Sequence, residues 1–143
     1  RFFCPTAPET FEWRQQGIPT VQTVVDATPE TLDNLAHMGG TYGYNIGHQD
    51  RGKIRPVRHQ GRPYFALVAD RPTGDSVSRR SMNHDGLGQN VLFEDGHVAF
   101  LRETKERTLG DLYFVSDRGL VEPGMHLNDA VIMESGKHLF ADQ

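Results

Sequence analysis

Short apolar segments separated by turn-forming residues constrain the fold of this chain more than any other feature. The segments are rich in aromatic and β-branched residues, and Gly, Asp, Asn or Pro separates one from the next, a pattern typical of strands. They are TYGYNI, PYFALVAD, NVLFE, HVAFLR and DLYFVS, while DRG at residues 50–52 and 117–119 predicts two turns. We therefore expect an α+β fold that is mostly antiparallel β-sheet with one or two short helices, and the 15 Gly and 8 Pro residues suit long loops.

The first 40 residues differ in character from the rest. VQTVV at residues 21–25 predicts a brief strand, whereas DATPETLDNLAHMGG predicts a helix that starts after an N-cap at Thr28 and ends at Gly39. A second short helix is expected to begin near Pro8. Because no repeat, low-complexity tract or linker divides the sequence, we expect residues 1–143 to form a single globular domain.

The composition argues against several classes of protein. The net charge is −4 and the basic residues form no run beyond Arg79-Arg80, so nucleic acid is not an expected partner. A single cysteine, Cys4, excludes an internal disulfide and a multi-cysteine zinc motif. The sequence contains neither a run of about 18 apolar residues nor a signal peptide, so we expect no membrane span in it.

The sequence FEDGHV contains the strongest turn-forming pair of the chain. Asp95-Gly96 between two apolar segments predicts a two-residue type I′ turn, in which both residues have positive φ. In that register Phe93 pairs with Val98. We expect the resulting apolar face to join the main core, which would contain Val91, Phe93, Val98 and Phe100 together with Tyr44, Phe65 and Leu67.

The loop NHDGLGQN, directly before this hairpin, contains candidate metal ligands. His84 and Asp85 lie in the loop, and Asp70 ends the segment PYFALVAD. One interpretation is that these three residues bind a divalent cation, either zinc through mixed His and carboxylate ligands or calcium through oxygens alone. Asp95 is expected to lie apart from this site, because a strand of about five residues spans roughly 17 Å.

The other interpretation is architectural, and it is the one we favour. In it, His84 is held by loop backbone or by a neighbouring carboxylate, and His97 is a surface partner of Glu94 across the hairpin. The sequence has no GxSxG, HExxH, P-loop or dinucleotide-binding motif. Cys4, within FFCPT, is more typical of a small buried residue than of a nucleophile. We therefore expect no catalytic residue, no cofactor and no enzymatic activity.

The same stretch resembles a motif of bacterial prepilin-type and pseudopilin-like proteins, which is written as His, nine residues, then Asp-Gly. Ten residues separate His84 from Asp95-Gly96 here, and NVLFEDGHVAFL is very similar to the core of the motif. RFFCPT is similar to the F-x-C-P-S element that follows the stalk helix of the family, GTYGYNIG to its S-Y-x-Y-N strand, and LVADRP to the strand before the His loop. The resemblance spans residues 1 to about 101 in the expected order, and the tail from Leu109 is similar to an extension of some members.

This resemblance implies a non-catalytic structural or interaction module, the globular head of a type IV pilin-like or type II secretion pseudopilin-like protein. Members lie in the bacterial cell envelope, on the periplasmic or extracellular side, and their partners are other pilin-like subunits or envelope proteins. They begin with a prepilin peptide and a long apolar helix that anchors them in the inner membrane. Because the sequence starts at Arg1, we expect this helix to be missing from it. We expect a membrane contact only through the missing helix. The motif residues His84, Asp95 and Gly96 would be structural, and the alternative is a small domain that binds a metal or ligand at His84, Asp85 and Asp70.

Overall fold

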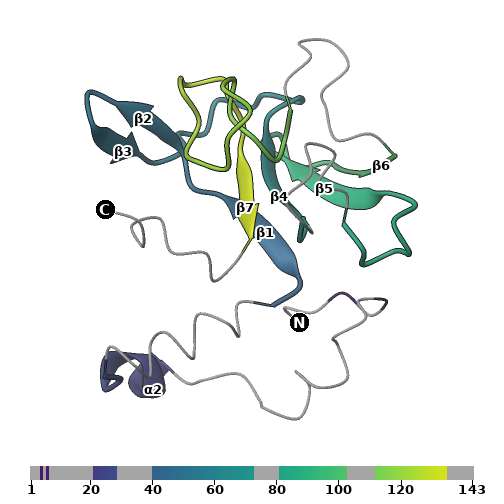
Figure 1. Cartoon of the computed structure of the whole chain (residues 1–143), viewed down its shortest axis with the longest axis horizontal. Coiled ribbons are helices and arrows are strands. Elements are labelled where there is room, and N and C mark those ends of the chain that lie inside the picture. The colour runs from purple at the N-terminus through teal and green to yellow at the C-terminus, as the bar shows by residue number, and fades with distance from the viewer. Residues whose placement is uncertain are drawn as a thin grey trace.

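An antiparallel five-stranded sheet forms the centre of the structure (Figure 1). The computed structural model describes residues 4, 6, 21–28, 40–72, 81–102 and 112–134. The strand order is β6-β5-β4-β1-β7, and β2 and β3 form a separate hairpin. The strands are β1 Tyr42–Asn45, β2 His48–Asp50, β3 Lys53–Arg55, β4 Ala66–Asp70, β5 Gln89–Phe93, β6 Val98–Leu101 and β7 Ile132–Glu134. The predicted, mostly antiparallel β-sheet is therefore confirmed.

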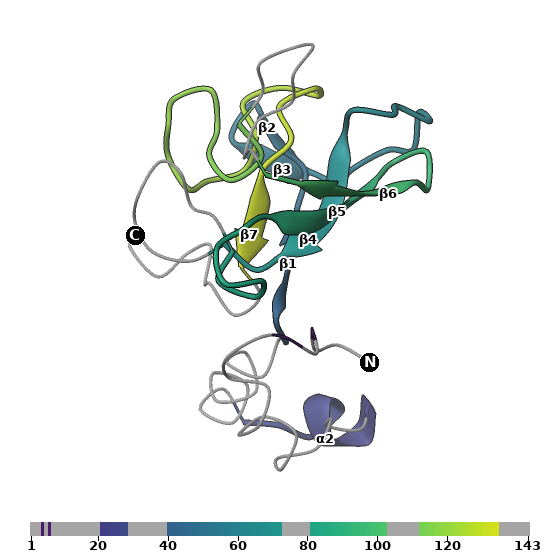
Figure 2. The same ribbon diagram turned by 90° about the vertical axis from the view of Figure 1, so that its right-hand side faces the viewer.

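Residues 21–25 form a helix, α2 (Val21–Val25), so the strand predicted there is wrong. The amide of Asp26 donates to the carbonyl of Gln22 at 3.0 Å, which closes the helical turn. α2 lies apart from the sheet in both Figure 1 and Figure 2, so its backbone is satisfied by local bonds instead of strand pairing. The body of the helix predicted after Thr28 and the helix predicted near Pro8 lie outside the described residues. Among the helical residues that the structure describes, none forms a helix long and apolar enough to cross a membrane.

The turn between β5 and β6 contains three residues, 94–96, instead of the predicted two. The amide of Phe93 donates to the carbonyl of His97 at 2.9 Å, and the amide of Gly96 donates to the carbonyl of Phe93 at 3.0 Å. Gly96 has a φ of 94°, whereas Asp95 does not have a positive φ. These are the features of a type I turn followed by a left-handed glycine. The hairpin is therefore confirmed, but the type I′ turn is wrong.

The additional turn residue shifts the register of β6 by one residue and exchanges its two faces. Val98 and Phe100, which were predicted to lie in the core, are 63% and 48% exposed. Ala99 and Leu101 pack against the core in their place. The observed pairs are Gln89 with Leu101, Asn90 with Phe100, Val91 with Ala99 and Leu92 with Val98.

The core lies on one face of the sheet. Val91, Phe93 and Phe65 are buried in it, as predicted, and Leu67 packs against it while remaining partly exposed. Tyr44 was also predicted to lie in the core but is 36% exposed, because its side chain lies on the opposite face of β1. We call this opposite side the outer face; its residues include Tyr44, Asn90, Val98 and Phe100.

The segment DLYFVS contributes to the core without forming the predicted strand. Tyr113, Phe114 and Val115 are buried, but the amide of Val115 bonds to the carbonyl of Leu112 at 3.2 Å in a turn. The fifth strand of the sheet is β7 instead, and its Ile132 amide donates to the Tyr113 carbonyl at 2.6 Å. β2, β3 and β7 were not predicted, and each contains only three residues.

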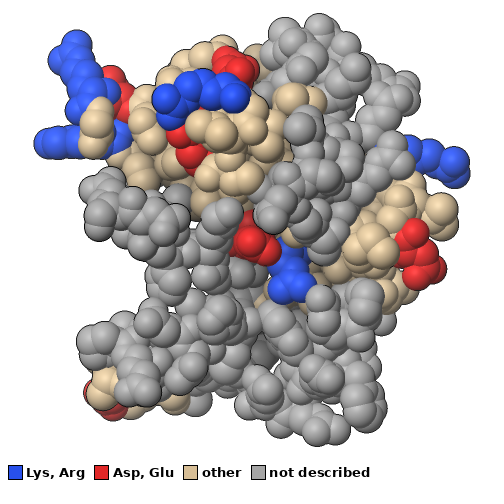
Figure 3. Space-filling view, viewed as in Figure 1, with Lys and Arg blue, Asp and Glu red and all other residues tan. Residues whose placement is uncertain are grey.

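Both turns predicted from the sequence DRG are present. Arg51 and Gly52 have φ values of 51° and 73° and connect β2 to β3. At the second turn, the amide of Gly119 donates to the carbonyl of Ser116 at 2.7 Å, and Gly119 has a φ of 74°. Figure 3 shows both basic and acidic side chains on the described part of the face in view, with basic groups projecting from the β2–β3 hairpin. Arg55 of this hairpin pairs with Asp50 at 3.1 Å.

A buried ion pair connects the β5–β6 turn to two other loops. Glu94, predicted to be a surface partner of His97, is buried and accepts hydrogen bonds from Arg62 Nε at 2.8 Å and Nη2 at 2.7 Å. Arg62 Nη1 donates to the carbonyl of Leu127 at 2.7 Å, and the guanidinium lies 3.5 Å from the centre of the Phe65 ring. The hydrogen bonds from Arg62 lower the pKa of Glu94 from 4.5 to about 2.

Candidate functional site

A β-bulge in β4 places Asp70 on the outer face of the sheet. The register with β5 shifts between Ala66 and Val68, so Leu67 is the additional residue. A bulge redirects the side chains that follow it. Here it aligns Asp70 with Asn90, whose backbone amide donates to Asp70 Oδ2 at 2.6 Å.

Asp70 is a fully buried carboxylate that accepts hydrogen bonds from uncharged donors. Its side chain is 0% exposed. Asn83 Nδ2 donates to Oδ1 at 3.0 Å, and Asn90 Nδ2 donates to Oδ2 at 3.2 Å. His84 Nε2 lies 3.0 Å from Oδ2 and is the one of these partners that can carry a positive charge. Because a buried carboxylate requires both hydrogen bonds and a compensating charge, this environment favours a cation beside Asp70.

The loop at residues 81–88 turns His84 toward the sheet. Asp85 and Gly86 have φ values of 55° and 70°, which reverse the chain directly after His84. The imidazole packs edge-to-face against Phe100 with ring centres 5.6 Å apart. The turn and this aromatic contact together fix the orientation of the ring, and a neighbouring carboxylate holds it, as the architectural interpretation predicted.

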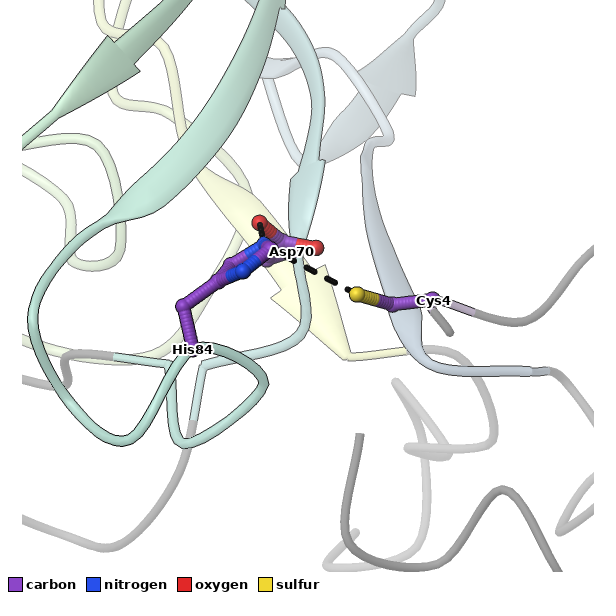
Figure 4. Close-up of side chains that lie close together, drawn as sticks. All are labelled: Cys4, Asp70 and His84. Carbon is purple, nitrogen blue, oxygen red and sulfur yellow. Dashed lines mark hydrogen bonds and ion pairs between the residues drawn. The ribbon is translucent and has the colours of Figure 1, made fainter. Parts of the chain in front are cut away.

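Cys4 reaches the same place from the N-terminal segment. It is buried, as predicted, and its amide donates to Thr41 Oγ1. Its Sγ lies 3.7 Å from His84 Nε2 and 3.2 Å from Thr6 Oγ1, which in turn lies 3.1 Å from His84 Nδ1. Figure 4 shows the sulfur pointing toward the pair formed by His84 and Asp70. Three segments that are distant in the sequence therefore meet at one point.

The arrangement of these groups differs from a catalytic triad. The potential ligand atoms of Cys4, Asp70 and His84 all lie within 4.8 Å of one another. Cys4 Sγ and Asp70 Oδ2 approach the same imidazole nitrogen, Nε2. In a triad of nucleophile, His and carboxylate, the two partners of the imidazole use opposite ring nitrogens. The cluster is instead a thiol, an imidazole and a carboxylate gathered around one point.

Tyr42 borders this cluster from β1. Its position in the sheet is opposite Asp70. Burial raises the pKa of the Tyr42 hydroxyl, and electrostatic interactions with Cys4 and Asp70 raise it further. Ionisation of the Tyr42 hydroxyl beside the cluster is therefore disfavoured, mainly because the group is buried.

The structure brings together two of the three predicted metal ligands. His84 and Asp70 are in contact, whereas Asp85 is an exposed turn residue and does not belong to the converging group. Cys4 takes its place, and sequence reasoning missed it because 80 positions separate it from His84. No motif spacing connects residues so far apart. The binding of a metal stays a prediction.

Asp95 and Gly96 lie at the opposite end of β5 from His84, as predicted. The Asp95 carboxylate accepts a hydrogen bond from the amide of His97 at 3.1 Å and contacts its Nδ1 at 2.6 Å. The backbone N–H and the ring of His97 lower the pKa of Asp95. These residues shape the turn and contribute nothing to the cluster around His84.

Comparisons of the sequence and fold with family models, curated proteins and solved structures gave no match. The basis for a function is therefore the geometry of this chain together with the resemblance of its sequence motifs. Two features of that geometry bear on function, namely the architectural roles of the motif residues and the cluster of Cys4, Asp70 and His84.

Proposed function

We propose that this chain is the globular head of a type IV pilin-like or type II secretion pseudopilin-like protein, a non-catalytic structural and interaction module of the bacterial cell envelope. The observation that carries the proposal is the contact between two elements of the resemblance that are 80 positions apart. Cys4, from the FFCPT element, lies 3.7 Å from His84, the histidine of the motif. In the resembled family the FFCPT-like element follows the stalk helix, so this contact would fix the head to its stalk.

The remaining motif residues have roles that agree with a structural function. Gly96 occupies the left-handed position of the β5–β6 turn, and Asp95 accepts hydrogen bonds within that turn. His84 anchors the loop at the other end of the same strand. The motif has no catalytic role in the resembled family. In this chain its residues shape the β5–β6 hairpin at one end and hold the loop before β5 at the other, which agrees with a structural role.

The outer face of the sheet offers a surface for partner contacts. Tyr44, Val98 and Phe100 expose large apolar side chains there, and β6 is the edge strand at that end of the strand order. Exposed apolar groups beside a sheet edge favour association with another chain. The proposed partners are other pilin-like subunits or envelope proteins on the periplasmic or extracellular side.

The coding sequence upstream of the codon for Arg1 provides the first test. We expect it to encode a short basic leader followed by an apolar helix of about 20 residues, the length that spans a bilayer. An upstream sequence that encodes a different kind of segment would contradict the proposal, whatever the outcome of the metal experiments below.

A second test examines assembly of the full gene product in its bacterial host. We expect Val98→Glu to reduce co-purification of pilin-like subunits from solubilised envelopes by about tenfold, equivalent to ~1.4 kcal/mol of binding. Leu120→Glu is the matched control, because Leu120 is 53% exposed but lies in a separate loop. Recovery of the wild-type product in the cytosol, or co-purification unaffected by Val98→Glu, would count against the proposed role.

A further inference from the structure

We propose that Cys4, Asp70 and His84 bind a single Zn²⁺ ion, which fastens the N-terminal segment to the outer face of the sheet. The inference rests on the geometry of these side chains and does not depend on the pilin-like function. It replaces the exposed Asp85 of the predicted ligand set with the buried Cys4.

The separations between the ligand atoms suit a tetrahedral zinc ion. With Zn–S of about 2.3 Å and Zn–N of about 2.0 Å, tetrahedral angles separate sulfur and nitrogen by about 3.5 Å. Cys4 Sγ and His84 Nε2 are 3.7 Å apart. Nitrogen and oxygen ligands of one ion are about 3.3 Å apart by the same geometry, and His84 Nε2 and Asp70 Oδ2 are separated by 3.0 Å. The third pair, Cys4 Sγ and the Asp70 carboxylate, lies within 4.8 Å, so these side chains would have to move together around the ion for all three to bind it.

The chemistry of the three groups selects zinc over calcium and magnesium. Thiolate and imidazole are ligands that zinc prefers, whereas calcium and magnesium bind oxygen almost exclusively. Calcium also takes about six to eight oxygen ligands. The cluster supplies one carboxylate, from Asp70, together with the sulfur of Cys4 and the nitrogen of His84.

A divalent ion also supplies the charge that the buried carboxylate requires. Among the described residues, Asp70 accepts hydrogen bonds from the uncharged amides of Asn83 and Asn90 and lies 3.0 Å from His84 Nε2. Binding of zinc would release the thiol proton of Cys4 and leave the imidazole neutral, because zinc binds the thiolate and the neutral ring. The ion would then neutralise both negative groups at once.

Asn90 is positioned to complete the coordination. Its Nδ2 lies 2.9 Å from His84 Nε2, on the side of the ring that faces Asp70. A half-turn of the amide about its Cβ–Cγ bond would present Oδ1 at this position as a fourth ligand, and a water molecule is the other candidate. Three protein ligands and a fourth position of this kind satisfy the usual zinc coordination number of four.

The experiment measures zinc binding to the full chain, purified free of metal and in its reduced form. Competition with a chromophoric chelator gives stoichiometry and affinity, and Co²⁺ substitution reports on the ligands through the thiolate-to-cobalt charge-transfer band. We expect one equivalent of zinc, a tetrahedral cobalt spectrum, and a melting temperature that falls on addition of chelator, since a metal bound only by the folded state stabilises it.

The variants Cys4→Ser and His84→Gln test the assignment of ligands. Replacing a residue that only hydrogen-bonds to a metal ligand lowers metal affinity by up to roughly 100-fold. Each of these two substitutions removes a ligand itself and should lower zinc affinity by more than that, and Cys4→Ser should also abolish the charge-transfer band. His126→Gln is the matched control, because His126 forms a similar pair with Asp117 at 2.9 Å but has no thiol beside it in the described structure. Circular dichroism establishes that each variant keeps its sheet. The cobalt spectrum of the wild type shows whether a thiolate binds the metal, and this measurement requires no substitution.

Three outcomes would overturn the proposal. The first is wild-type protein that binds no stoichiometric zinc. The second is a cobalt complex without the thiolate band. The third is zinc affinity that is unchanged in folded Cys4→Ser and His84→Gln but lost in His126→Gln, which would place the ion at the surface pair of His126 and Asp117.

Discussion

The residue Glu94 explains why the turn of the β5–β6 hairpin has three residues. The Asp95-Gly96 pair is compatible with a two-residue turn and with a three-residue turn, because both require a left-handed glycine. The choice is made by contacts from outside the hairpin: Arg62 holds the Glu94 carboxylate, and the amide of Glu94 donates to the carbonyl of Phe65 at 2.9 Å. Glu94 therefore joins the turn instead of pairing with His97. Local sequence contains no trace of this contact, which spans 32 positions.

Substitution of Gly96 tests the left-handed turn position. A Cβ atom at Gly96 would meet nothing within 4 Å, so the cost of a side chain is conformational strain alone. At a φ of 94°, Gly96→Val should lower the free energy of unfolding by more than about 1 kcal/mol. Gly96→Asn should cost less, because Asn tolerates the left-handed region. Urea unfolding at a constant m-value measures both, and equal midpoints for the two variants would be inconsistent with the turn described.

Truncation of two phenylalanines tests the register of the β5–β6 element. Phe93 is buried, stacks on His97 and contacts Tyr113, so Phe93→Ala should cost roughly 3–5 kcal/mol of unfolding free energy. Phe100 is on the outer face and half exposed, so Phe100→Ala should cost about 1 kcal/mol or less. Chemical denaturation of both variants gives the comparison. Equal large losses would indicate the two-residue turn, in which both rings share the core face.

The strands that could be predicted from sequence are those long enough to show a pattern. β1, β4, β5 and β6 contain four or five residues each, and aromatic or β-branched side chains mark them. β2, β3 and β7 have three residues, which is too short for alternation to be recognised. The Val-rich sequence of α2 favours a strand by propensity, but this segment has no sheet beside it in the described structure.

The candidate site could be predicted only in part, because it is a product of the whole molecule. His84 and Asp70 come from a loop and a strand end that sequence patterns could place at one edge of a sheet. Their alignment also requires the bulge at Leu67, which no local pattern indicates. Cys4 joins them from the far end of the chain, and contacts of that kind depend on the packing of complete segments.

The stability of the whole molecule should depend on pH through the ion pair of Arg62 and Glu94. The folded state lowers the pKa of Glu94 from 4.5 to about 2, so this stabilisation is present above about pH 4.5 and is lost as the pH falls toward 2. The loss is on the order of 3 kcal/mol at 1.36 kcal/mol per pKa unit. Urea unfolding between neutral pH and pH 2.5 should show it in the wild type.

Glu94→Gln isolates this contribution from the other carboxylates. The variant should be less stable at neutral pH and should lose less stability in acid, because its side chain does not titrate. The pKa values of Asp95 and Glu122 are also lowered, so these groups also lose stabilising interactions in acid. Their contribution is the same in the wild type and in Glu94→Gln, so it cancels when the two pH profiles are subtracted. Parallel pH profiles for the wild type and the variant would show that the pair of Arg62 and Glu94 does not govern acid stability.

The strand order has a consequence for the synthesis of the protein. β1 lies between β4 and β7, so one of its edges pairs with Glu134 and its neighbours, which the ribosome adds about 90 positions later. Ala130, Val131 and Ile132, next to or within β7, are completely buried. Until they emerge, the nascent chain displays an open strand edge and an incomplete core, the two features that promote aggregation of partly made domains. The five-stranded sheet is therefore completed only after the ribosome has added β7, and the segment from β1 to β6 depends on protection until then.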